Sequence, residues 1–88
     1  MAGRIGASIE GLTELKTTFD SQAQRIEELI STISGRLANT DWEGPASERF
    51  RGQWGSDFEP SLRNLRSALE ECGVEVARRR ENLINAGS

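Results

Sequence analysis

Apolar residues recur along this chain at alternating steps of four and three, and this spacing constrains the fold more than any other feature. In the first half the stripe begins at Ile5 and ends at Leu37, with Leu15 and Leu29 beside it. Steps of four and three place side chains on one face of an α-helix. We therefore predict one amphipathic helix over about residues 5–39. Its expected core residues are Ile9, Leu12, Phe19, Ile26, Ile30, Ile33 and Leu37.

The same spacing returns in the second half and predicts a second helix over about residues 46–84. Pro60 lies inside this pattern and has no backbone N–H to donate, so a kink is expected near it. Cys72 falls on the apolar stripe, where a free thiol usually packs as a small buried side chain, and this role is favoured over a redox role. The expected core residues of this helix are Phe50, Trp54, Phe58, Leu62, Leu65, Leu69, Cys72 and Val76.

A cluster of turn-forming residues separates the two patterns and predicts a tight turn over about residues 40–45. Gly44 can adopt backbone angles closed to other residues, and Pro45 suits the first position of a helix. Two long helices joined by a short turn lie antiparallel. The predicted fold is therefore all-α, with residues 1–88 forming one antiparallel two-helix hairpin.

The hairpin is too small to cover its own apolar residues. A chain of 88 residues buries a modest fraction of its surface on folding. Each apolar stripe is also broader than the contact that one neighbouring helix provides, which would leave a large exposed apolar patch. We therefore expect dimerisation with a second hairpin into a four-helix bundle.

Composition argues against several other classes of function. The chain has one Cys, no His and no Tyr, so we expect no metal site, no cofactor and no catalytic residues. The net charge of −3 gives no field that would attract nucleic acid. No run approaches the ~20 apolar residues of a membrane span, and the N-terminus lacks the apolar block of a cleavable signal. We expect synthesis in the cytoplasm and no stable membrane insertion.

The turn contains the sequence Trp42-Glu43-Gly44, set between two long amphipathic helices and followed by Phe50 and Trp54. In this context the chain resembles the WxG-motif family of early-secreted-antigen-like proteins, which are substrates of type VII secretion systems. The resemblance spans nearly the whole chain. It implies a helical hairpin, dimeric four-helix bundles, and export as a folded pair by a membrane-embedded ATPase, to the extracellular space or the cell envelope. Trp42 would pack at the turn and could also be recognised directly by the secretion machinery.

One expected feature of the family is missing near the C-terminus. Exported members commonly carry a Tyr-x-x-x-Asp/Glu signal late in the second helix, but here Val76 takes the Tyr position and Arg80 the acidic position. The resemblance therefore implies the subunit of a heterodimer that supplies the W-x-G turn while its partner, a second W-x-G-type hairpin, carries the signal. A homodimer of this chain is the second possibility for the pairing. The alternative function is a cytoplasmic helical adaptor that is never exported.

Overall fold

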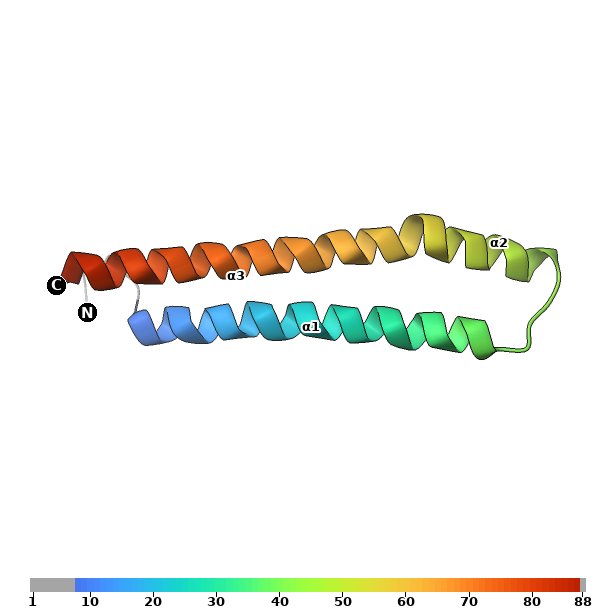
Figure 1. The fold of residues 1–88 in the computed structure, drawn as a ribbon, viewed down its shortest axis with the longest axis horizontal. Coiled ribbons are helices and arrows are strands. Elements are labelled where there is room, and N and C mark those ends of the chain that lie inside the picture. Colours follow the sequence, from blue (N-terminus) through green and yellow to red (C-terminus); the bar gives the residue numbers. More distant parts are fainter. Residues whose placement is uncertain (1–7, 88) are drawn as a thin grey trace, which may run out of the picture.

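The computed structural model describes residues 8–87, which form a long antiparallel helical hairpin (Figure 1). Helix α1 spans Ile9–Asn39, and the returning arm consists of α2 (Pro45–Gln53), the π-helical turn η1 (Trp54–Phe58) and α3 (Glu59–Gly87). The described residues extend over 64 × 23 × 18 Å, so the molecule is a rod. The predicted all-α hairpin is confirmed.

Among the described residues, helix α1 begins at Ile9, directly after Ser8. Ser8 has extended backbone angles, and its hydroxyl accepts a hydrogen bond from the amide of Gly11 at 2.7 Å. Serine is a preferred residue at this position because its side chain satisfies an amide that has no partner inside the helix. The predicted helical residues 5–7 lie outside the described part of the chain. Ser8 therefore marks the N-terminal boundary of α1.

The sequence predicts a kink near Pro60, and the returning arm has one π-helical turn, η1, just before this residue and continues as a helix beyond it. In η1 the turn is wider than in an α-helix, and the amide of Glu59 donates to the carbonyl of Trp54, five residues earlier. Pro60 cannot donate to the carbonyl four residues before it, and a single wide turn accommodates this missing bond without ending the helix. The arm continues to Gly87, three residues beyond the predicted end at residue 84.

The core of the hairpin is thin. Ala23 and Ile30 are the only apolar side chains that are fully buried among the described residues. The line of α1 that contains both buried residues follows steps of seven: Lys16, Ala23, Ile30 and Leu37. The line of α3 that contains the buried Gly73 does the same and is mostly polar: Glu59, Arg66, Gly73 and Arg80. Beside it lie half-buried apolar residues, so α3 directs polar and apolar side chains toward α1: Leu62, Leu69, Val76 and Leu83.

Gly73 explains why one of the two predicted lines on α3 is displaced by one residue from the contact with α1. It is buried, and a Cβ atom at this position would lie 3.6 Å from the Cβ of Phe19, so the helices approach closely here. One residue corresponds to about 100° around a helix. Burial of the Gly73 line therefore turns the preceding line outward, and the expectation that Cys72 is buried is wrong for the hairpin. The exposed line is Phe58, Leu65 and Cys72.

Gly44 occupies the end of the turn with φ 111° and ψ 175°, a region that is accessible essentially to glycine alone. We expect Gly44→Ala to lower the free energy of unfolding by about 1–3 kcal/mol through backbone strain, measured by urea denaturation followed by circular dichroism. No atom lies within 4 Å of an added Cβ at Gly44 or at Gly52. Gly52→Ala, inside α2, is the matched control and should raise stability by up to about 1 kcal/mol. Equal effects of the two substitutions would refute the role of the backbone angles.

Candidate functional site

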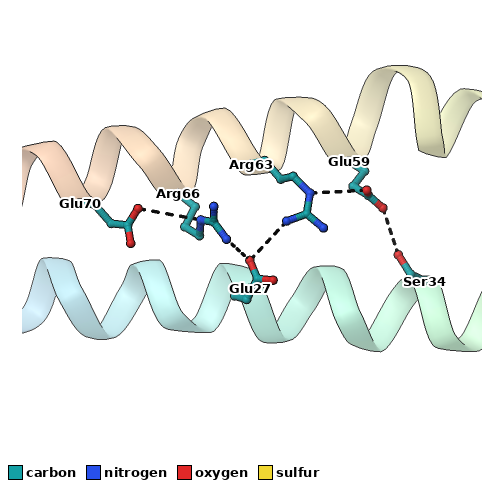
Figure 2. A network of polar contacts seen from close by, with 6 residues as sticks. All are labelled: Glu27, Ser34, Glu59, Arg63, Arg66 and Glu70. Atoms are coloured by element: carbon teal, nitrogen blue, oxygen red, sulfur yellow. Dashed lines mark hydrogen bonds and ion pairs between the residues drawn. The ribbon is translucent and has the colours of Figure 1, made fainter.

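The two long sides of the rod differ in chemistry, and the first carries a network of ion pairs between α1 and the returning arm. Glu27 of α1 pairs with both Arg66 and Arg63, and Arg63 also pairs with Glu59 at 3.5 Å. The hydroxyl of Ser34 donates to the carboxylate of Glu59 at 3.3 Å (Figure 2). We call this side the ionic face. Its residues are Thr13, Glu27, Ser34, Trp54, Glu59, Arg63, Arg66, Glu70 and Arg80.

Polar groups on the ionic face bond to one another within the chain. The indole Nε1–H of Trp54 donates to the hydroxyl of Ser34 at 3.1 Å, so Trp54, expected in the apolar core, instead joins this network. Toward the open end of the hairpin, Nε of Arg80 donates to the hydroxyl of Thr13 at 2.5 Å. Nε of Arg66 has no hydrogen-bond partner and lies 4.0 Å from the carboxylate of Glu70. Because the other groups named here already have partners, the ionic face offers little that a second apolar hairpin could bind.

Apolar side chains gather on the opposite side. On α1 each apolar residue of this side directly precedes a polar residue of the ionic side: Leu12 and Thr13, Phe19 and Asp20, Ile26 and Glu27, Ile33 and Ser34. Successive residues of a helix lie about 100° apart, so the two lines lie on either side of the contact between the helices. On α3, Leu62 and Arg63 lie on either side of this contact in the same way. We call this second side the apolar face. Its residues are Leu12, Leu15, Phe19, Ile26, Leu29, Ile33, Phe58, Leu62, Leu65, Leu69, Cys72, Val76 and Leu83.

None of the residues of the apolar face is fully buried by the hairpin. Leu29 is 42% exposed and Leu65 is 48% exposed. Helix α1 is about 45 Å long by helical rise, and the rod is 23 Å wide. A strip of this size offers on the order of 1,000 Å², above the roughly 800 Å² that each partner contributes to a standard stable interface. Ile30 and Leu37, by contrast, lie at the contact between the helices, and Ile9 is exposed at the start of α1.

The turn end of the rod presents two aromatic rings. The rings of Trp42 and Phe50 lie 5.8 Å apart between centroids and are tilted by 51°, which is a favourable arrangement for an aromatic pair. Trp42 is 40% exposed. The prediction that Trp42 packs at the turn therefore applies to its contact with Phe50, while a large part of the ring faces solvent.

Two polar residues that the sequence analysis did not select organise this turn. Ser47 is buried, and its hydroxyl donates to the carbonyl oxygen of Trp42 at 2.8 Å. The Nε atom of Arg51 donates to the same hydroxyl at 2.9 Å, and its terminal nitrogens donate to the carbonyls of Leu37 and Thr40. The only sequence signal for them is their position two and six residues after Pro45, within the first two turns of the second helix.

The positions of the degenerate export signal lie far from the turn. Val76 and Arg80 are both half-buried on the side of α3 that faces α1, and Arg80 bonds Thr13 near the start of α1. From Thr13 to the end of α1 at Asn39 the helical rise is about 39 Å. One chain therefore cannot bring its own turn and its own tail into a single site.

The three adjacent arginines of α3 do not form one basic surface. Arg79 and Arg78 bond the carboxylate of Glu75 at 2.7 and 2.8 Å, while Arg80 extends to α1. The hydrogen bond from Arg79, aided by the charge of Arg78, holds the pKa of Glu75 below its ordinary value. The carboxylate thus stays charged at neutral pH and partly neutralises the two neighbouring guanidinium groups.

Within residues 8–87 no cluster of side chains has the makings of a metal site. No helix in this part of the chain combines the length and apolar character needed to cross a membrane. Comparisons with models of known protein families, with curated proteins and with solved structures found no match. The apolar face and the aromatic turn are therefore the features from which a function has to be argued.

Proposed function

We propose that this chain works by pairing through its apolar face with a second W-x-G-type helical hairpin, and that the resulting four-helix bundle is exported as a folded pair by a type VII secretion ATPase. The proposal assigns the chain no catalytic activity and no cofactor. In this pair the chain supplies the W-x-G turn with Trp42 and Gly44, and its partner supplies the tail signal that Val76 and Arg80 lack.

The observation that carries the proposal is the difference between the two long sides of the rod. Polar groups of the ionic face find partners inside the chain, whereas apolar side chains of the opposite face, such as Leu29 and Leu65, remain substantially exposed. Contiguous apolar surface of this size on a small protein is typical of an interface with another protein. A second hairpin offers a matching strip because its helices have similar length and spacing.

The length of the rod supports an antiparallel arrangement of the two hairpins. Trp42 lies at one end, and the tail positions Val76 and Arg80 lie toward the other end. A composite site made from the turn of one chain and the tail of another requires the partner to run in the opposite direction. This arrangement also places the partner's signal-bearing helix beside the aromatic pair of Trp42 and Phe50.

A partner-deletion experiment tests the proposal. Removing the gene for the signal-bearing hairpin is expected to eliminate this chain from the culture medium, because the chain has no complete tail signal of its own. The measurement is a quantitative immunoblot of cell and medium fractions, with a cytoplasmic enzyme as the lysis control. Unchanged secretion without the partner would contradict the heterodimer proposal. A chain found only in the cell fraction, even with the partner present, would favour the alternative of a cytoplasmic helical adaptor.

A further inference from the structure

We infer that Arg51 and Ser47 are positioning residues that fix the backbone of the turn and thereby hold Trp42 in one exposed orientation. That Trp42 is presented for recognition rests on the proposed function. That Arg51 and Ser47 hold it in place rests on the contacts within this chain and can be tested without the secretion machinery.

The guanidinium group of Arg51 bridges three segments of the hairpin. One terminal nitrogen donates to the carbonyl of Leu37 in the last turn of α1. The other lies 3.1 Å from the carbonyl oxygen of Thr40 and 3.4 Å from that of Trp42. A planar guanidinium presents several donors in a fixed fork. The side chain therefore connects α2, the end of α1 and the turn through one rigid group.

Ser47 links the side chain of Arg51 to the backbone of the turn. Its side chain is 2% exposed, and its hydroxyl accepts from Nε of Arg51 and donates to the carbonyl oxygen of Trp42. The carbonyl of Trp42 is thus held by two side chains of α2. A hydroxyl buried in this way loses its partner if either neighbour is removed, and an unsatisfied buried polar group is unfavourable.

The role of Arg51 extends beyond capping the end of α1. Helix ends leave four carbonyl groups without helical partners. In α1 these are the carbonyls of residues 36–39, and that of Arg36 accepts from the hydroxyl of Thr40. Arg51 donates to a second one, that of Leu37, and also to carbonyls of the turn.

The result is an aromatic surface whose geometry is set before any partner arrives. The backbone of Trp42 is fixed by Ser47 and Arg51, and its ring rests against Phe50, the residue immediately before Arg51. A rigid exposed aromatic group loses less conformational freedom on binding than a mobile one. Trp42 is therefore prepared for contact with another protein at the end of the rod.

The test is ¹⁵N relaxation of the labelled full-length chain in its helical state, comparing Arg51→Gln with Arg49→Gln. If the isolated chain is not helical, the W-x-G-type partner hairpin is added unlabelled to every sample. Arg49 is an exposed arginine of the same helix, so both variants lose the same charge at nearly the same place. In the wild type we expect backbone order parameters of about 0.8 at residues 41–44, and a similarly restricted indole N–H of Trp42. In Arg51→Gln these values should fall below about 0.6, the range of flexible backbone, with the centre of α1 unchanged. Arg49→Gln should match the wild type.

Arg51→Lys separates positioning from charge. A lysine keeps the positive charge but cannot span three carbonyl groups from one planar group, so the turn should remain mobile in this variant. Full rescue of turn rigidity by lysine would overturn the bridging role. A turn that is already mobile in the wild type, or one that stays rigid in Arg51→Gln, would overturn the inference entirely.

Ser47→Ala covers the case in which Arg51→Gln loses its helical structure altogether. This smaller change removes the bond to the carbonyl of Trp42 and leaves the bond from Arg51 to Leu37. Lower order at residues 41–44 with an unchanged circular dichroism spectrum supports positioning, whereas a rigid turn in Ser47→Ala contradicts it. The relaxation readout follows the turn and not the pairing. If the proposed function were wrong, secretion of the chain would not depend on the partner, but the variants at Ser47 and Arg51 would still show a more mobile turn than the wild type.

Discussion

Replacing Leu65 with glutamate is expected to weaken pairing of the hairpin at least 100-fold, equivalent to about 2.7 kcal/mol. Leu65 is 48% exposed and belongs to the outer line of the apolar face, together with Phe58 and Cys72. In a four-helix bundle this line meets the second hairpin, so the new carboxylate would be transferred from water into an apolar interface without a partner. The measurement is the amount of partner hairpin that copurifies with the tagged chain, checked by native mass spectrometry of the eluate.

The matched control for this variant is Val74→Glu. Val74 is 57% exposed on the same helix, but it follows the buried Gly73 and so lies on the side of α3 turned away from the apolar face. A glutamate there remains in water, and pairing should stay within about twofold of the wild type. Similar losses from Leu65→Glu and Val74→Glu would mean that pairing uses a different surface.

The second large effect is expected from Ile30→Ala. Ile30 is 2% exposed and is the largest fully buried side chain among the described residues. Truncating a buried isoleucine removes its contacts and leaves a cavity, at a typical cost of about 2–5 kcal/mol. In a hairpin with so thin a core, this loss is a large fraction of the total stability. Urea denaturation of the helical assembly, followed by circular dichroism, measures it.

Val74→Ala is the comparison for Ile30→Ala. It also shortens a β-branched apolar residue on a helix, but at an exposed position, where substitutions usually change stability by less than about 0.5 kcal/mol. Alanine also has the higher helix propensity, which works against any small loss. If Ile30→Ala proved as mild as Val74→Ala, the described contact line between α1 and α3 would be wrong.

Periodicity predicted the helices well because apolar spacing alone determines which segments are amphipathic. On α3 it predicted half of the contact correctly, because Leu62, Leu69 and Val76 are half-buried. The other half is displaced by one residue, since two neighbouring lines share the same steps of seven. The line with Leu65 and Cys72 is the more apolar one, so apolar spacing alone favours it. The structure instead directs Arg66 and Gly73 toward α1. The choice depends on close approach at Gly73 and on the ion pair between Arg66 and Glu27, which are visible only once both helices are placed.

Polar residues of the turn were missed for a related reason. Ser47 and Arg51 lie in a helix without apolar periodicity, and neither residue type signals a structural role by itself. Their importance arises from carbonyl groups of Leu37 and Thr40 that come from the other arm. The W-x-G sequence, in contrast, was recognisable because a glycine before a proline predicts a turn that needs unusual backbone angles, and Gly44 has them.

Native mass spectrometry of the purified full-length chain at micromolar concentration, with circular dichroism on the same sample, tests the central claim that the hairpin needs a second hairpin on its apolar face. We predict a poorly helical monomer that becomes helical when the W-x-G-type partner is added, with one copy of each chain in the complex. A helical homodimer would preserve the bundle and refute the heterodimer. A fully helical monomer would contradict the account, because it would show that the hairpin is stable with its apolar face exposed to water.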